Sequence, residues 1–206
     1  IYENAQALSF TAGDMIDNDY DSERQHLFSV AERLLKGNPN IVGINLIFEP
    51  NIIGMDEDFV GDPRFQDDGQ FVSYVSNLYG DLNIDYINNY ASYEMYTKAV
   101  TLKDDFFTEP YYFVIEDEEI YVSTVVFPIV RQGEFLGLVG IDFTADYIFE
   151  QMMLLDNRYD RRDIIVSQSG TILLNSKDES DFGELISSIH TNYEEGIEEV
   201  NERGIV

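Results

Sequence analysis

Residues 109–143 read EPYYFVIEDEEIYVSTVVFPIVRQGEFLGLVGIDF, and the fold prediction for the chain starts from them. Three runs of β-branched and aromatic residues are separated by four-residue polar turns at 116–119 and 131–134. Runs of this length with such turns predict an antiparallel meander of three strands. The last run, residues 135–143, is apolar except for a single acidic residue, Asp142. Most of the functional interpretation depends on that aspartate.

The position of Asp142 along its strand allows two interpretations. Because side chains alternate across a strand, Leu138, Gly140 and Asp142 are expected on one face, where the glycine leaves unfilled room. An ionised carboxylate there needs a cation or several hydrogen-bond donors to offset its desolvation. Asp142 could meet this need by binding a ligand, or by capping a helix that starts near Thr144. One carboxylate has two oxygens, so the two roles are compatible.

The composition excludes several classes of function. The formal net charge is −28, from 40 acidic and 12 basic residues, which argues against binding to nucleic acid or to an anionic membrane surface. There is no cysteine, so disulfides and thiolate metal sites are excluded. His26 and His190 are far apart and have no metal-ligand spacing. We therefore expect no metal and no cofactor.

The chain begins with a helical pattern. Apolar or small residues recur at spacings of three and four from residue 2 to about residue 36, which predicts one long helix. The segment Gly37-Asn38-Pro39 ends it, with glycine just past the helix and proline soon after. No apolar run approaches the ~20 residues that span a bilayer, and the start lacks the order of a signal peptide.

The remaining elements follow from shorter patterns. Residues 40–50 and 70–75 are predicted strands, and residues 51–69, rich in Gly, Asp and Pro, are a long loop. Residues 144–157 are a predicted helix, and residues 163–174 form a hairpin around a Ser-Gly turn.

Four tyrosines in the region 82–107 are spaced as on one helical face, namely Tyr86, Tyr90, Tyr93 and Tyr96. They could be ordinary amphipathic core residues. Alternatively, some of them could wall a ligand pocket, because a phenol offers a flat apolar face and a hydroxyl.

This order of elements resembles the double Cache family of extracytoplasmic sensor domains, which are PAS-like domains of bacterial or archaeal histidine kinases and chemoreceptors. The resemblance is carried mainly by Gly133–Phe143 (GEFLGLVGIDF). Weaker matches are Asn38–Ile44 (NPNIVGI), Phe48–Asn51 (FEPN), Asp68–Tyr74 (DGQFVSY), Pro110-Tyr111 and Ser123–Ile129 (STVVFPI).

The resemblance implies an α+β fold in which a long N-terminal helix precedes two PAS-like modules, each with a central antiparallel sheet. The helix would span residues 1–37, the membrane-distal ligand-binding module residues 38–157, and a smaller, partial membrane-proximal module residues 158–206. The domain would lie outside the cytoplasm, attached through transmembrane segments outside this chain. The N-terminal helix is a candidate homodimer contact, and a closing ligand would displace it slightly.

In relatives of this family that bind amino acids, the aspartate at the place of Asp142 takes the ligand's ammonium group. An Arg-x-Trp-Tyr stretch holds the ligand's carboxylate. The matching stretch here, Tyr93-Glu94-Met95-Tyr96, keeps the final tyrosine and lacks the arginine and the tryptophan. The resemblance thus implies that the ammonium half of the site is kept, which points to an amine or an amino-acid-like ligand.

An ammonium group beside Asp142 and among phenols would gain ionic and cation-π energy. The predicted ligand-binding residues are Asp142, Tyr96, Tyr93, Tyr111, Tyr121 and Ser123. Tyr121 and Ser123 share one strand face, and packing or exposure is an equal reading of either.

Two other classes of function remain as alternatives. A glycosidase with paired carboxylates fits the acidic composition, but no acid pair differs from a solvated face and no Gly-x-Ser-x-Gly motif is present. We therefore expect no enzyme activity. The second alternative is a ligand-free interaction module that relays the state of a partner protein through the long helix.

Overall fold

A computed structural model of the chain confirms the predicted α+β class. It describes residues 1–18, 24–77, 82–115, 118–144, 147, 164–167, 169–175, 177–178, 181 and 183–189. The chain divides into two compact units. The first consists of Ile1–Thr108 and Thr124–Phe143, and the second of Glu109–Ser123 and Thr144–Val206.

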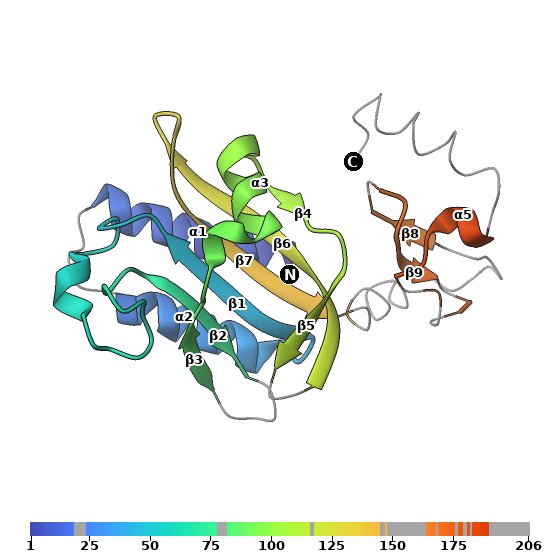
Figure 1. The fold of residues 1–206 in the computed structure, drawn as a ribbon, viewed down its shortest axis with the longest axis horizontal. Helices are drawn as coiled ribbons and strands as arrows, with labels where there is room; N and C mark the ends of the chain where they lie inside the picture. The colour runs from blue at the N-terminus through green and yellow to red at the C-terminus, as the bar shows by residue number, and fades with distance from the viewer. Residues whose placement is uncertain are drawn as a thin grey trace. The chain divides into compact units, whose positions relative to one another are not determined.

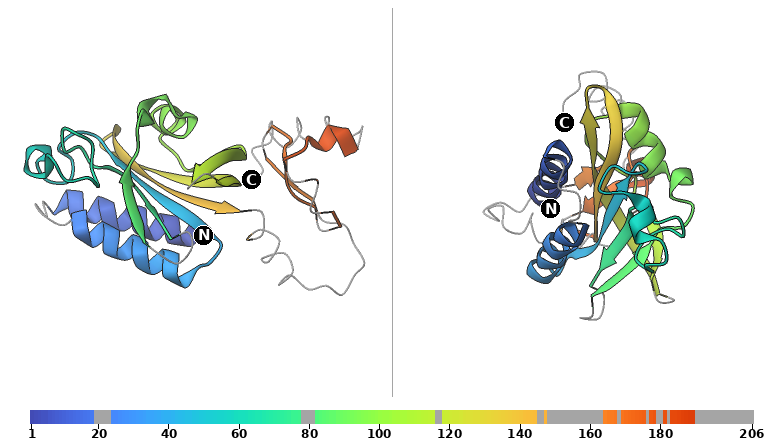
Figure 2. Two further views of the ribbon diagram at one scale, coloured as in Figure 1. Left: turned by 60° about the horizontal axis from the view of Figure 1, so that its bottom comes forward. Right: turned by 90° about the vertical axis from the view of Figure 1, so that its left-hand side faces the viewer.

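Two helices, α1 (Tyr2–Asp17) and α2 (Arg24–Gly37), occupy the region where the sequence predicts one. They lie side by side, antiparallel, on one face of the sheet (Figures 1 and 2). The prediction of a single continuous helix is wrong because α1 ends at Asp17 and is capped by Asn18, whose side-chain amide donates to the carbonyl of Asp14. Folding back places the apolar stripes of both helices against the same sheet, where a single straight helix would leave one stripe in water.

The sheet of the first unit is antiparallel in all its described pairings. Its strands are β1 (Ile41–Phe48), β2 (Val72–Ser76), β3 (Asn83–Tyr86), β4 (Phe106–Phe107), β6 (Glu118–Arg131) and β7 (Glu134–Thr144). Their order is β3-β2-β1-β7-β6-β4, and β5 (Tyr111–Ile115) pairs with β6.

The meander predicted for residues 109–143 is confirmed as β5, β6 and β7. The turn between β6 and β7 has positive φ angles at both central residues, 54° at Gln132 and 84° at Gly133. A two-residue hairpin turn of this kind matches the right-handed twist of the strands, and the glycine adopts it at little cost.

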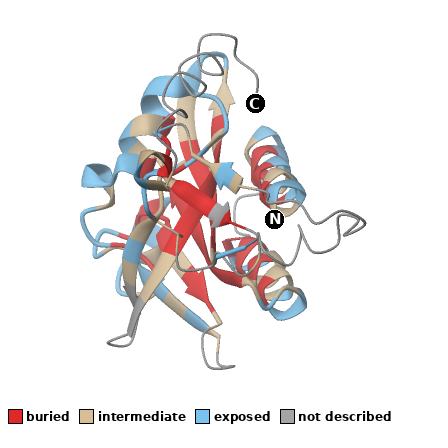
Figure 3. Ribbon diagram, turned by 90° about the vertical axis from the view of Figure 1, so that its right-hand side faces the viewer, coloured by how far each residue is buried: buried red, intermediate tan, exposed pale blue. Residues whose placement is uncertain are grey.

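Helices cover both faces of this sheet. α1 and α2 lie on one face and α3 (Glu94–Leu102) lies on the other (Figure 2). The α3 face contains a fully or nearly buried apolar cluster: Ile47, Val72, Ile87, Met95, Ala99, Val126 and Leu138. Figure 3 shows burial concentrated on the central strands and on the inner sides of α1 and α2. The α3 face is therefore a packed one.

The insertion between β2 and β4 differs from its prediction. Tyr86 ends β3, Tyr90 begins the 3₁₀ helix η3 (Tyr90–Ser92), and Tyr93 precedes α3. The prediction of one helical face for the four tyrosines is wrong because Asn89, with φ 53°, adopts a left-handed conformation that no continuous helix allows. The long loop after β1 is confirmed, and contains the 3₁₀ helix η1 (Asp56–Phe59).

In the second unit, the predicted hairpin is confirmed as the antiparallel pair β8 (Ile164–Val166) and β9 (Ile172–Asn175). The short helix α5 (Ile186–Ile189) follows. The helix predicted for residues 144–157 lies outside the described residues except at Thr144 and Tyr147. In the described part of the chain, none of the helices combines the length and the apolarity that crossing a membrane requires.

Candidate functional site

The centre of the candidate site is Asp142 on β7, whose residue is 1% exposed. The hydroxyl of Thr124 on β6 donates to its Oδ1 at 2.6 Å, and the side-chain amide of Asn45 on β1 donates to the same oxygen at 3.1 Å. Two neutral donors from the neighbouring strands thus offset part of the cost of burying the carboxylate. The cap predicted for a helix near Thr144 concerns residues outside the described range.

The room predicted beside Gly140 is filled. A Cβ atom at this glycine would lie 3.1 Å from Met95 Sδ and 3.3 Å from Asn45 Cβ. Gly43 is paired with Asp142 across the sheet, and a Cβ on it would overlap the ring of Tyr74. The two glycines therefore let α3 and a phenol approach the sheet closely on either side of the aspartate.

A second group of polar contacts lies at the aromatic edge of the α3 face. The hydroxyl of Tyr96 donates to Glu49 Oε1 at 2.5 Å. Burial and the Glu49 carboxylate raise the pKa of Tyr96 well above that of a free tyrosine, so its hydroxyl stays protonated. The ring of Tyr96 packs edge-on against Tyr90 at 5.0 Å and against Phe135 at 5.7 Å. This edge presents a carboxylate and phenols.

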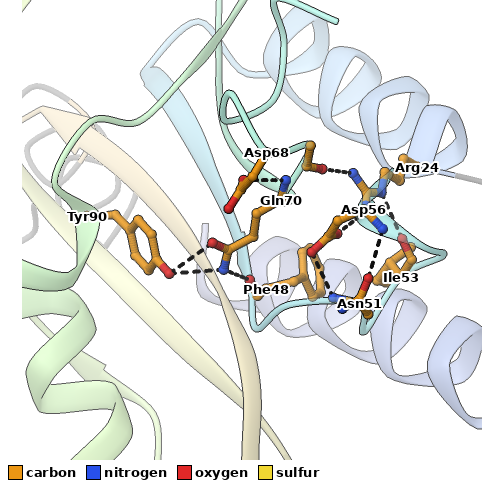
Figure 4. Close-up of polar contacts among 9 residues, drawn as sticks. Arg24, Phe48, Asn51, Ile53, Asp56, Asp68, Gln70 and Tyr90 are labelled. Atoms are coloured by element: carbon orange, nitrogen blue, oxygen red, sulfur yellow. Dashed lines mark hydrogen bonds and ion pairs between the residues drawn. The ribbon is translucent and has the colours of Figure 1, made fainter. Parts of the chain in front are cut away.

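The Tyr90 hydroxyl is linked to a buried network around Arg24 (Figure 4). Gln70 donates to Tyr90 Oη at 2.9 Å and to the Phe48 carbonyl at 2.8 Å. The neighbouring Gly69 carbonyl accepts from Arg24 at 2.6 Å, and the same guanidinium pairs with Asp56 at 2.5 Å. This network attaches the long loop to α2 and thereby positions Gln70.

The predicted site residues do not all lie in the same part of the structure. Tyr96 lies on the α3 face, whereas Tyr93 is 42% exposed at the start of α3. Tyr111, Tyr121 and Ser123 belong to the second unit.

Tyr121 and Ser123 do not share the face of β6 that carries Thr124, because side chains alternate along a strand. Tyr121 instead packs against Gly183 and stacks on Tyr112 at 4.5 Å within the second unit. The expectation that these two residues face the same ligand as Asp142 is therefore corrected. Tyr111 pairs with Val122 in the β5–β6 ladder.

Three residues next to Asp142 were not predicted from the sequence: Asn45, Tyr74 and Thr124. Alternation along β1 and β2 puts Asn45 opposite both Gly140 and Tyr74. The available signal was that Asn45 is a polar residue on the less apolar face of a predicted strand. The strand pairing that brings it near Asp142 is not visible in the sequence. In the described part of the chain, no group of three or more His, Asp or Glu side chains could hold a metal ion.

Comparisons with known proteins agree with this fold. The methyl-accepting chemotaxis protein TlpQ of Pseudomonas aeruginosa is 24% identical over 135 residues, which are 58% of this chain and 19% of that protein. The chain thus matches only about a fifth of the length of that relative.

The solved structures that are similar to the chain include the following two. The extracellular domain of mmHK1S-Z3, described as a histidine kinase, has a TM-score of 0.74 at 24% identity, over 98% of this chain and 72% of that one. The ligand-binding domain of the Campylobacter jejuni chemoreceptor Tlp3, solved with L-valine, has a TM-score of 0.61 at 13% identity, over 93% and 69%.

A family model matches residues 27–150, more than half of the chain, including β1, α3, β7 and Asp142. The predicted class, an extracytoplasmic sensor domain, is thereby confirmed. The chain belongs to the methyl-accepting chemotaxis protein-like family of first PDC sensor domains.

Proposed function

We propose that this chain senses a small molecule for a transmembrane chemoreceptor or histidine kinase, and that it binds an amine at Asp142. The observation that carries the proposal is the buried Asp142 carboxylate, held by the neutral donors Thr124 and Asn45 on the sheet face that α3 covers. Neutral donors offset only part of the desolvation of a charge. An ammonium group would add a positive charge and short, charge-assisted hydrogen bonds.

The stretch at residues 93–96 supports an amine over an amino acid, because it contains no arginine that could bind a ligand carboxylate. Tlp3 was solved with L-valine, so we expect the present chain to differ in ligand from that relative. Tyr74 lies beside Gly43, the residue paired with Asp142, and offers an aromatic face for a cation.

The organisation of the whole receptor belongs to the same proposal. The ligand-binding module would span residues 38–157 and a membrane-proximal module would begin near residue 158. The module binds its ligand and releases it unchanged, without catalysis. Transmembrane segments outside this chain attach it to the membrane, and a homodimer forms through the N-terminal helices.

The test is a thermal-shift screen of primary amines, α-amino acids, purines and carboxylates. A ligand that binds only the folded state at 100 times its Kd stabilises it by about 2.7 kcal/mol, so a binding amine should raise the melting temperature by several degrees. Asp142→Asn, which keeps the shape and removes the charge, should abolish that shift.

The matched control is Glu134→Gln, which removes a carboxylate from an exposed position on the same strand. It should leave the amine-induced shift intact. If only carboxylates or purines shift the melting temperature, or if Asp142→Asn responds to amines as fully as the original sequence, the proposed amine site is wrong.

A further inference from the structure

The two units of the chain are joined at only three peptide bonds. These are Thr108–Glu109, Ser123–Thr124 and Phe143–Thr144. Any change that ligand binding in the first unit transmits along the chain to the second must pass through these three points. The residues on both sides of them therefore determine how the units are coupled.

Within the first unit, hydrogen bonds link the residues that lie at or next to the three connections. Thr108 N donates to the Thr124 carbonyl at 2.9 Å, and Thr124 N donates to Thr108 Oγ1 at 2.9 Å. The Thr124 hydroxyl then donates to Asp142, one residue before the third connection. All three residues are at most 6% exposed. We call Thr108, Thr124 and Asp142 the threonine clasp.

Within the second unit, the residue at the first connection, Glu109, is also fixed by hydrogen bonds. Glu109 follows Thr108 directly, and its Oε2 accepts hydroxyl hydrogen bonds from Ser167 at 2.5 Å and from Ser169 at 2.6 Å. Burial alone would raise the pKa of Glu109, but these hydroxyls and the backbone N–H of Ser169 outweigh it and lower the pKa. Glu109 therefore stays ionised and bound to the turn between β8 and β9.

We propose that the threonine clasp couples occupancy of Asp142 to the second unit, with Thr124 as the positioning residue. The inference rests on the proposed amine site. An ammonium group that binds Oδ1 of Asp142, the oxygen that accepts from Thr124 and Asn45, competes with the Thr124 hydroxyl, which must then reorient. Because the Thr124 backbone is bonded to Thr108, the strain reaches Glu109 and the β8–β9 turn through one peptide bond. Shifts of order ~1 Å at packed junctions are sufficient for such switches.

The experiment measures the distance between the units without any ligand. The chain contains no cysteine, so Arg33→Cys on α2 and Ser188→Cys on α5, both exposed, can carry spin labels for pulsed electron paramagnetic resonance. Thr124→Val removes the hydroxyl and keeps the branched shape. It should shift or broaden the distance distribution by more than about 2 Å, whereas Thr124→Ser should keep the original distribution.

Two further variants extend the measurement. Asp142→Ala removes the acceptor of the Thr124 hydroxyl and should change the distribution in the same direction as Thr124→Val. Thr101→Val makes the same chemical change on the exposed side of α3 and should change nothing.

If Thr124→Val does not fold, Glu109→Gln replaces it, because it disturbs the same path within the second unit. An unchanged distribution in Thr124→Val, or in its replacement if Thr124→Val does not fold, would overturn the inference, and so would an unchanged distribution in Asp142→Ala. Since no amine is present, that result leaves the thermal-shift screen and the proposed amine site intact, and a failed screen leaves the distance measurement interpretable.

Discussion

At the residue scale, Arg24 shows how one sequence position can organise a long loop. Its side chain donates to the carbonyls of Ile53 and Gly69 and pairs with Asp56, while Phe59 lies 3.9 Å from its guanidinium. Burial lowers the pKa of Arg24, and the partner carboxylate opposes this effect. The guanidinium charge is tolerated inside the protein because each of these groups offsets part of its desolvation cost.

Removing the partner of Arg24 should be costly. Asp56→Ala leaves a guanidinium that is 1% exposed without its ion pair, and we expect a loss of about 3–5 kcal/mol in the free energy of unfolding, measured by urea denaturation. Asp17→Ala breaks the exposed pair with Arg131 and should leave the urea midpoint unchanged. Equal effects of the two changes would show that burial does not decide the strength of the Arg24 pair.

At the element scale, the contact between β1 and β2 depends on Gly43. The ring of Tyr74 lies where any side chain at residue 43 would project, and both residues are on the α3 face of the sheet. Strand pairing therefore brings a bulky phenol next to Asp142 only because the intervening residue has no side chain.

Gly43→Ala should displace the Tyr74 ring and destabilise the fold by about 1–3 kcal/mol, as overpacking does. Thermal unfolding of Gly43→Ala, Tyr74→Leu and the double variant forms a cycle, and the double variant should be less destabilised than the sum of the single ones. Gly37→Ala, at a helical position with open space around the new methyl group, should not destabilise. Strict additivity in the cycle would contradict a direct clash between residues 43 and 74.

At the scale of the whole molecule, the net charge of −28 dominates. Salt bridges such as Arg131–Asp17 and Lys36–Glu32 leave this net charge unchanged, because each pairs one positive group with one negative group. Unpaired like charges repel one another in the compact state, and salt screens that repulsion over about 10 Å at 0.1 M. Stability should therefore depend strongly on ionic strength.

We expect the melting temperature to rise between 10 mM and 500 mM NaCl, because screening removes self-repulsion that the unfolded chain relieves by expanding. LiCl and KCl at equal ionic strength are the controls, and they should act alike if screening is the cause. A melting temperature that is constant across this range, or that rises with only one of the cations, would contradict the screening mechanism.

Local patterns predicted much of the fold. The β5–β6–β7 meander, β1 and the β8–β9 hairpin were predicted because alternating apolar runs and turn residues are encoded within a few neighbouring positions. The sequence predicts helical structure over residues 2–36 correctly, but it predicts one helix where the structure has two. Whether a helix folds back depends on where the sheet lies, which is not a local property.

The candidate site likewise has one feature that local sequence predicts and others that depend on the fold. Local sequence is enough to recognise Asp142 as a single charge in an apolar strand, because its apolar neighbours are adjacent in the chain. The donors that hydrogen-bond to this charge are known only once the strands are paired in space. Thr124 is 18 positions away and Asn45 is 97 positions away, and strand order and register bring both to one carboxylate oxygen. The physical reason is that hydrogen bonds act over about 3 Å of space, whatever the separation along the chain.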